Sequence, residues 1–212
     1  MSIRQTTPEQ TTAMVTNKNE LASIRTTRKL IHVARRHFSL YGYANTSLEA
    51  IVEEMNMTRG AIYHHYKNKK ALFIAVLHQV QAEVGEHVER EAMTSADTWE
   101  QLILGCVGFV EAATLDTNRR ILLIDAPTVI EWDEWRRIDN ENSVALLEEQ
   151  LLTIKAGGGL VSIDVRLLSH MISGALNDLS LYLAETKLLD RDSIYHSIAH
   201  LVKGFRNNVK EI

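Results

Sequence analysis

Apolar residues recur at helical spacing along most of the chain. The first apolar stripe consists of Ile31, Ala34, Phe38 and Tyr41. Gly42 follows this stripe, and glycine at such a position is typical of the end of a helix. The sequence contains only two prolines and few segments that alternate between apolar and polar residues, as strands do. The pattern therefore predicts an all-α fold.

Two short helices with a tight turn between them are predicted over residues 46–66. The stripe of the first helix consists of Leu48, Ile51, Val52 and Met55. Thr46 is predicted to cap this helix, in a capping box with Glu49, and Thr58 is predicted to cap the second helix. Asn56 in the turn tolerates left-handed backbone angles. Such a pair is typical of a helix-turn-helix, which presents its second helix to a partner.

Longer helices are predicted on the C-terminal side. A linking helix carries the stripe Leu72, Phe73, Val76, Leu77 and Val80. The body is expected to begin near Thr98 with a strongly apolar helix. Pro127 suits a first helical position, so one helix is expected to end near Asp125 and a long one to begin there. Beyond a Gly-rich turn at residues 156–160, two amphipathic helices have wide apolar stripes.

These elements divide the chain into three parts. Residues 1–20 are polar, Thr-rich and without period, and they are expected to form a flexible arm. Residues 21–82 are expected to form a helical head that contains the helix-turn-helix, at about residues 46–66. Residues 83–212 are expected to form a larger helical body. Its two C-terminal helices either pair with their symmetry mates as a dimer interface or pack within the chain.

The distribution of charge changes this picture more than the total charge does. The net charge is −4, which taken alone argues against a nucleic-acid partner. Residues 21–75, however, contain nine Lys and Arg against three Glu, whereas residues 76–212 contain twelve Lys and Arg against twenty-two Asp and Glu. A basic head on an acidic body favours an anionic partner for the head, because binding depends on the local potential.

Composition favours a cytoplasmic protein. The single cysteine, Cys106, cannot form an intramolecular disulfide, which fits a reducing compartment. No early segment combines basic residues with an apolar run in the way a signal peptide does. No segment has the uninterrupted apolar length that a membrane span needs, so no membrane partner is expected.

The sequence gives little support for catalysis or for a metal site. It contains no metalloprotease helix motif, phosphate-binding loop or dinucleotide-binding glycines, so no enzymatic activity and no cofactor are expected. His64 and His65 are adjacent on a predicted helix and point about 100° apart, so they do not converge on one ion. His196 and His200 have a better spacing for a metal, but a role in a dimer interface or in solvent is favoured.

One ordered set of residues runs through the predicted helix-turn-helix. It comprises Phe38, Gly42, Tyr43, Thr46, Ser47, Ile51, Thr58, Arg59, Gly60, Tyr63, Tyr66 and Lys69. This set resembles the DNA-binding domain of the tetracycline-repressor (TetR) family of bacterial regulators. One departure is in the turn, where the family usually has Ala-Gly and this chain has Met55-Asn56. The resemblance implies a homodimer that places two recognition helices in successive major grooves of a palindromic double-stranded DNA operator.

The resemblance also implies which side chains contact DNA. Six of them suit phosphate oxygens, through hydroxyl groups, an imidazole or an ammonium group: Thr46, Ser47, Thr58, Tyr63, His64 and Lys69. Arg59 suits a base edge, because its guanidinium offers two parallel donors. Gly60 either allows close approach of a sugar-phosphate backbone or is a glycine tolerated near a helix N-terminus. His65 and Tyr66 are expected to face the following helix.

A ligand site in the body is less well defined by the sequence. Cys106, Trp132 and Trp135 are the candidates for ligand contacts, although packing between helices accounts for the same residues. The expected function is that of a DNA-binding transcriptional regulator, a repressor released from its operator by an unknown small molecule. The alternatives are a dimeric DNA-binding regulator that answers to no ligand and a helical enzyme.

Overall fold

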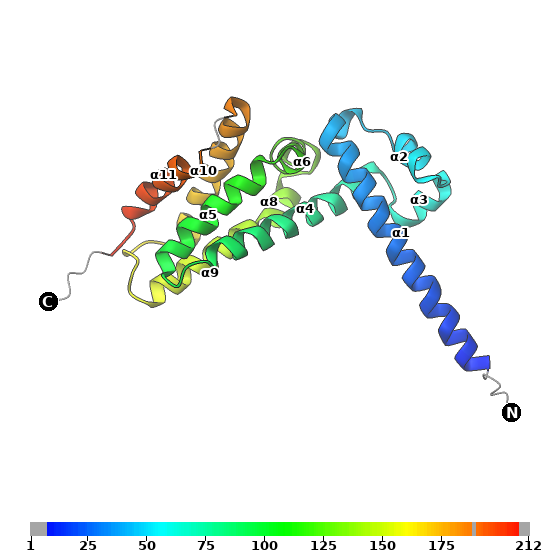
Figure 1. The fold of residues 1–212 in the computed structure, drawn as a ribbon, viewed down its shortest axis with the longest axis horizontal. Helices are drawn as coiled ribbons and strands as arrows, with labels where there is room; N and C mark the ends of the chain where they lie inside the picture. The colour runs from blue at the N-terminus through cyan, green and yellow to red at the C-terminus, as the bar shows by residue number, and fades with distance from the viewer. Residues whose placement is uncertain (1–7, 188–189, 208–212) are drawn as a thin grey trace.

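The molecule is all-α, with a head and a body joined by one long helix (Figure 1). The computed structural model describes the backbone of residues 8–187 and 190–207, and side chains from residue 20 onward within these ranges. The linking helix is α4 (Lys69–Ala92), which runs from the head along the body. The all-α fold predicted from the sequence is confirmed. No helix in the described ranges combines the length and the apolar character that a bilayer crossing requires.

The head is built from three helices and the first turns of α4. The three helices are α1 (Pro8–Asn45), α2 (Leu48–Met55) and α3 (Arg59–His65). The Phe73 ring of α4 lies edge-on to the rings of Phe38 and Tyr43, with centroids 5.1 and 5.2 Å apart. Ile51 of α2 and Ile62 of α3 complete the buried core of the head. This core holds the predicted helix-turn-helix against α1.

Helix α1 begins earlier than the sequence pattern indicates. Its backbone is helical from Pro8, and proline suits this start because a first helical residue needs no N–H donor. The arm predicted for residues 1–20 therefore does not extend to residue 20, and residues 1–7 lie outside the described part. Gly42 interrupts α1 with φ 78° and ψ 167°, a conformation open essentially to glycine alone. The stop predicted at Gly42 is confirmed.

The body is a bundle around α5. Its helices are α5 (Thr98–Thr114), α6 (Asp116–Arg119), the π-helix η1 (Arg120–Asp125), α7 (Ala126–Val129), α8 (Trp132–Asn140), α9 (Ser143–Ala156), α10 (Val165–Thr186) and α11 (Arg191–Lys203). Helix α5 packs against α4, α9, α10 and α11. Gly108 allows the close contact with α4, because a Cβ at this position would lie 3.1 Å from the Cβ of Glu91. The two predicted C-terminal helices are present as α10 and α11.

The prediction of a long helix from Pro127 is wrong. The helical backbone continues through Asp125 from η1 into α7, so the helix end predicted near Asp125 is also wrong, and α7, which contains Pro127, ends at Val129. Ile130 is then extended, with its side chain 3% exposed, and α8 begins separately at Trp132. The chain therefore bends so that Ile130 can enter the core, where a continuous helix was the expectation.

Candidate functional site

The turn between α2 and α3 sets the direction of α3. Asn56 ends α2 in the left-handed conformation, with φ 50°, and its N–H donates to the carbonyl groups of Val52 and Glu53. Thr58 caps α3, because its hydroxyl oxygen accepts the N–H of Ala61 at 3.3 Å. The turn and this cap agree with the sequence prediction. They hold a seven-residue helix on the outside of the head.

One face of α3 is buried, and the opposite face is exposed. Ile62 is 1% exposed in the head core, whereas Tyr63 is 51% exposed and His64 also lies on the surface. The guanidinium of Arg59 pairs at 3.0 Å with the carboxylate of Glu49. The predicted capping box does not form, because the Thr46 N–H donates to the carbonyl groups of Gly42 and Tyr43. Both side chains of the pair between Arg59 and Glu49 are exposed, so the pair is weak and leaves Arg59 available to a partner.

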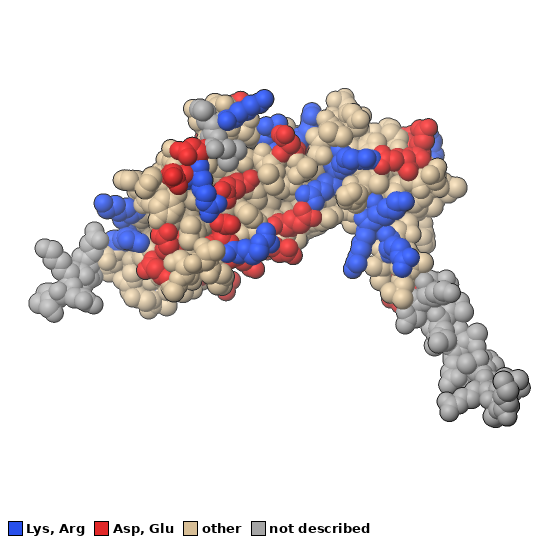
Figure 2. Space-filling view, viewed as in Figure 1, with Lys and Arg blue, Asp and Glu red and all other residues tan. Residues whose placement is uncertain are grey.

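Basic side chains gather on the head. On the face drawn in Figure 2, a group of Lys and Arg lies on the head, whereas Asp and Glu lie mainly along the body, where they are mixed with further Lys and Arg. Part of the acidic charge of α2 is neutralised within the head, because Arg36 of α1 pairs with Glu54. His37 also contacts this carboxylate, but burial lowers the pKa of its imidazole, which favours the neutral form. The charge asymmetry of the sequence is therefore also a property of the surface.

Gly60 lies in the first turn of α3 with open space around it. Among the described residues, no heavy atom would lie within 4 Å of a Cβ at this position, so packing in the free protein does not require glycine. Replacing Gly60 with alanine is expected to stabilise the free protein by up to about 1 kcal/mol, since alanine favours helix. The same change is expected to weaken DNA binding, because the methyl group would occupy the place of an approaching sugar-phosphate backbone.

Thermal unfolding and DNA titration of this single variant measure both effects. An unchanged affinity for DNA would show that Gly60 is only a glycine tolerated at a helix start.

The residue that caps α2 is Ser47, which corrects the prediction for Thr46. The hydroxyl oxygen of Ser47 accepts a backbone N–H of α2 at 3.1 Å. Thr46 is 2% exposed, and its hydroxyl donates to the carbonyl of Gly42 at 2.8 Å, with the His37 carbonyl at 3.2 Å. A buried hydroxyl with these partners holds the end of α1 and does not reach a phosphate. Ser47 and Thr58 remain exposed candidates for that contact.

Lys69 has a structural role that the sequence did not predict, and its phosphate contact stays a prediction. Its ammonium group donates to the carbonyl groups of Tyr43 at 2.8 Å and Thr46 at 2.9 Å. The same group lies 4.3 Å from the centroid of the Tyr43 ring, within the range of a cation–π contact. These contacts tie the first residue of α4 to the end of α1 and the start of α2. The charge is thus already held inside the head.

Replacing Lys69 with methionine is expected to lower the free energy of unfolding by about 1–2 kcal/mol, because two part-buried carbonyl groups lose a charged donor. The matched control is Lys67→Met, which removes the same charge from an exposed position. This control is expected to change stability by less than about 0.5 kcal/mol. Urea unfolding followed by circular dichroism measures both variants, and equal stabilities would contradict the structural role of Lys69.

His65 and Tyr66 both face inward, but His65 does not face the following helix as predicted. Tyr66 is half-buried against the head core, and burial raises the pKa of its phenol. His65 faces α1 instead of the following helix, because its Nδ1 lies 3.1 Å from the hydroxyl oxygen of Thr27. The surface of α3 therefore divides between His64, which points outward, and His65, which holds the helix to α1.

A polar network joins the head to the body. Arg35 of α1 donates twice to the carboxylate of Glu83 on α4, at 2.6 and 2.7 Å, and once to the side-chain oxygen of Asn118 at 2.7 Å. Asn118 of α6 is 4% exposed, and its amide nitrogen donates to the Ala112 carbonyl of α5 at 2.9 Å. The position of α1 is therefore linked to the last turns of α5 by side chains that are far apart in the sequence.

A second contact between head and body surrounds Gly42. The N–H of Tyr43 donates to the carboxylate of Asp125 at 2.8 Å, and the guanidinium of Arg120 donates to the Leu40 carbonyl at 3.4 Å. Both body residues belong to η1, and short π-helical segments are frequent at functional sites. Arg120 lies so close that a Cβ on Gly42 would be 2.6 Å from its Nε. Glycine at this position thus permits the contact.

The body contains a cavity of about 360 Å³ between α4, α5, α9 and α10. Its inner wall is apolar and includes Leu102, Cys106 and Phe109, which are buried. Its outer part includes Glu89 of α4 and Glu149 of α9, which are exposed. A cavity of this size, with an apolar wall and a few polar groups, is typical of small-molecule sites. The two acidic residues carried no signal in the sequence, because surface glutamates are common on helices.

The three predicted ligand candidates do not lie together. Cys106 lines the cavity, and burial raises the pKa of its thiol to about 12, so the thiol stays protonated and is not a nucleophile. Trp132 and Trp135 lie outside the cavity lining, on α8, with ring centroids 5.1 Å apart. Trp132 is 59% exposed, and the Arg136 guanidinium lies 4.9 Å from its ring centroid. Trp132 is therefore a surface residue, whereas Trp135 is partly buried and packs against the core.

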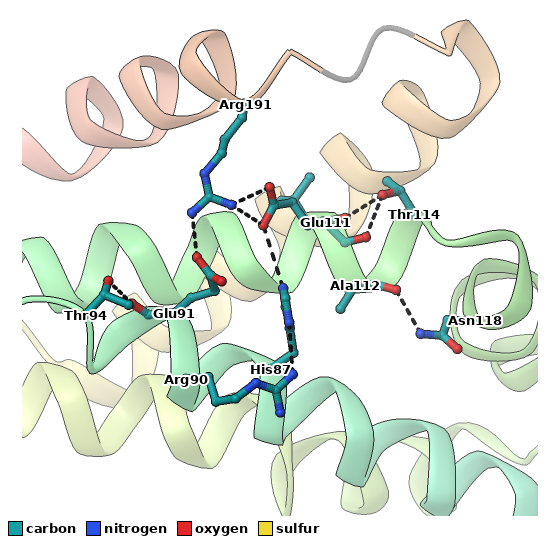
Figure 3. Close-up of polar contacts among 10 residues, drawn as sticks. His87, Arg90, Glu91, Thr94, Glu111, Ala112, Thr114, Asn118 and Arg191 are labelled. Carbon is teal, nitrogen blue, oxygen red and sulfur yellow. Dashed lines mark hydrogen bonds and ion pairs between the residues drawn. The ribbon is translucent and has the colours of Figure 1, made fainter.

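Ion pairs tie the start of α11 to α4 and α5 (Figure 3). Arg191 reaches from α11 and donates to the carboxylates of Glu91 on α4 and Glu111 on α5. The Nε2 of His87 lies 3.7 Å from the Glu111 carboxylate. His87, Glu91 and Glu111 have potential metal-ligand atoms within 4.8 Å of one another, but Arg191 already places a positive charge between the two carboxylates. The cluster therefore fixes helix positions.

Helix α10 presents an exposed apolar stripe. The stripe consists of Leu167, Met171, Gly174, Ala175 and Tyr182, and the exposed Asp178 interrupts it between Ala175 and Tyr182. Its three large side chains are between 55% and 60% exposed. The opposite face, which includes Leu168 and Ile172, is buried against the body. A row of exposed large apolar side chains on one helix face marks a candidate interaction surface.

Comparison with known proteins relates these features to one family. Residues 30–76 match the sequence profile described as "Bacterial regulatory proteins, tetR family". Residues 99–205, which make up half of the chain, match the profile described as "Tetracyclin repressor-like, C-terminal domain". The chain belongs to the TetR family. In this TetR-family protein, the first profile covers the helix-turn-helix. The second covers α10, α11 and the cavity walls formed by α5, α9 and α10, but not the wall formed by α4.

Relatives of this TetR-family protein match it over different lengths. The HTH-type transcriptional regulator AcrR of Shigella flexneri is 32% identical over 99 residues, which are 46% of this chain and 46% of AcrR. The chain thus aligns with less than half of the length of that relative. A TetR-family transcriptional regulator from Pectobacterium atrosepticum has a similar structure, with a TM-score of 0.69 and 28% identity, over 90% of this chain and 97% of that one. FadR from Bacillus subtilis, solved in complex with stearoyl-CoA, shares the fold, with a TM-score of 0.68 and 22% identity, over 82% of this chain and 96% of FadR.

Proposed function

We propose that this TetR-family protein is a dimeric, ligand-responsive transcriptional repressor that binds double-stranded DNA at a palindromic operator. The observation that carries the proposal is the exposed face of α3, where Arg59, Tyr63 and His64 project from a helix held by its turn and cap. Arg59 has the donors to read a base edge. Tyr63 and His64, with the exposed hydroxyl groups of Ser47 and Thr58, suit phosphate oxygens.

The exposed apolar stripe of α10 supports a homodimer formed through the two C-terminal helices. A second copy related by a two-fold axis would cover the stripe, with α10 and α11 of both copies forming a four-helix bundle. Two heads in successive major grooves would then read half-sites about 34–36 Å apart. In this arrangement residues 21–82 bind DNA, and residues 83–212 bind the ligand and dimerise.

The cavity and the head–body contacts support regulation by a small molecule. Helix α4 lines the cavity and also carries Glu83, a partner of Arg35 in the head. Helix α5 lines the cavity and accepts the hydrogen bond from Asn118, the other partner of Arg35. A ligand that prefers one arrangement of α4 and α5 shifts the population toward it, and α1 follows through Arg35. The stearoyl-CoA complex of FadR supports a ligand-binding role for a body of this fold.

Recovery of genomic DNA fragments tests the proposal. The purified protein is mixed with sheared DNA from its own host at moderate salt, and the bound fragments are sequenced. A palindromic sequence is expected to be enriched, and a Y63A/H64A variant is expected to lose the enrichment while it keeps its fold. A protein that enriches no sequence would contradict operator binding, and an enriched site without two-fold symmetry would contradict the dimer.

A further inference from the structure

We infer that the body cavity takes a lipophilic cation, a molecule with an apolar body and one positively charged group, in preference to an acyl-CoA or another anion. The inference deepens the proposed ligand-responsive function and rests on it. It is carried by the charges around the cavity. Among the described residues, the lining includes the carboxylates of Glu89 and Glu149 but no Lys, Arg or His.

The inner wall of the cavity suits only an uncharged part of a ligand. Leu102, Cys106 and Phe109 are between 3% and 7% exposed, and all three face the cavity. The Cys106 thiol stays protonated at neutral pH, because burial raises its pKa to about 12. A phosphate or carboxylate placed here would lose its hydration without gaining a basic partner. The part of the ligand that enters deepest is therefore apolar.

The mouth of the cavity has free negative charge. Glu89 and Glu149 lie on different helices, α4 and α9, and both are exposed where they line the cavity. None of the ion pairs in the described ranges uses either carboxylate. The neutral amide groups beside them already have partners, because the Gln150 amide donates to the Thr98 carbonyl at 2.7 Å and to the Gln101 side-chain oxygen at 3.2 Å. The carboxylates thus remain for the charged group of a ligand.

Helices α4, α9 and α10 carry basic side chains, such as Arg90, Lys155 and Arg166, but none of these lines the cavity. Helix α5 contains no Lys or Arg. The N-terminus of α9, at the cavity-lining residue Ser143, has a partial positive charge of about half an elementary charge. This is smaller than the charge of the two carboxylates and does not balance the several negative charges of a CoA group. The local potential therefore favours a cation.

Probes of matched shape and opposite charge test the inference with the full-length protein. Tetraphenylphosphonium and tetraphenylborate have nearly the same size and shape, and stearoyl-CoA represents the acyl-CoA class. Calorimetric titration is expected to show tight binding of tetraphenylphosphonium. In the E89Q/E149Q variant its affinity is expected to fall about fivefold, and the cation-to-anion affinity ratio about tenfold. The matched control E86Q/E148Q makes the same charge change outside the cavity lining and is expected to keep the ratio within about twofold.

The comparison of variants also cancels intrinsic differences in affinity between the two probes, because the affinity of each probe for a variant is compared with its affinity for the parent protein. Ser173→Phe fills the cavity and is expected to abolish binding of the cation while the circular dichroism spectrum stays unchanged. A ratio that does not respond to E89Q/E149Q would overturn the inference. So would stearoyl-CoA binding more tightly than the cation, or cation binding that persists in the S173F variant.

DNA titration separates a failure of this inference from a failure of the proposed function. Stearoyl-CoA that binds the protein and releases recovered operator DNA, while tetraphenylphosphonium does not bind, would overturn the cation class and leave the ligand-responsive repressor standing. Tetraphenylphosphonium that binds through Glu89 and Glu149 but leaves DNA affinity unchanged would support the cation class and contradict release of the operator by the cavity ligand.

Discussion

Replacing Arg59 with alanine is expected to weaken binding to the operator by about 1–3 kcal/mol and to relax base preference at one position of each half-site. The side chain is 69% exposed, and its contact in the head is the exposed pair with Glu49. The stability of the free protein is therefore expected to change by less than about 0.5 kcal/mol. The loss of affinity then reports the missing contact with DNA and not a damaged head.

His64→Ala is the matched control for this variant, since it changes a neighbouring exposed residue that suits phosphate instead of a base. It is expected to weaken binding to all sequences alike and to reduce the dependence of affinity on salt. Competition titrations with the operator and its single-base variants, at several salt concentrations, measure both properties. An R59A variant that keeps the parent's base preference and salt dependence would contradict the role of Arg59 as a reader of bases.

Replacing Gly42 with alanine is expected to lower the free energy of unfolding by at least about 2 kcal/mol, for two reasons. Its backbone conformation, φ 78° and ψ 167°, is essentially closed to alanine and costs about 1–3 kcal/mol. The new Cβ would also lie 2.6 Å from the Nε of Arg120. Arg120 must then move, and it loses its hydrogen bond to the Leu40 carbonyl.

The Arg120→Ala background separates these two causes. There the Gly42→Ala change keeps the backbone strain but no longer meets a side chain, so its cost is expected to fall by about 1 kcal/mol. Urea unfolding measures the four proteins of this cycle at one fixed protein concentration, because the proposed dimer would make apparent stability depend on concentration. A cost below about 0.5 kcal/mol in the parent background would contradict the strained conformation of Gly42.

The helix-turn-helix could be predicted from the sequence because its signals act within a few residues. Asn56 permits the turn, and Thr58 caps the helix that follows it. The sequence does not decide whether Thr46 or Ser47 caps α2, because both neighbouring residues have a hydroxyl group that satisfies the capping pattern. The structure decides it through Gly42, whose conformation brings its carbonyl within reach of Thr46 and so buries that residue.

Side chains whose roles depend on distant partners could not be assigned from the sequence. The charge of Lys69 suits a phosphate, yet its partners Tyr43 and Thr46 lie 26 and 23 residues away. The bond from Arg35 to Asn118 spans 83 residues. The cavity likewise depends on how four helices pack, and no local pattern of apolar residues distinguishes its wall from an ordinary core. Periodicity indicates which face of a helix is buried but not which helix covers that face.

Because Lys69 is hydrogen-bonded to the end of α1 and the start of α2, a tilt of α4 moves the head with it. With 24 residues, α4 is about 36 Å long, so a tilt of about 5° at its body end displaces its head end by about 3 Å. Because Lys69 and the Phe73 ring fix the first turns of α4 to the head, the helix-turn-helix follows this displacement as one unit. In the proposed dimer, a small shift beside the cavity would therefore be amplified into a misfit between the two heads and the double helix.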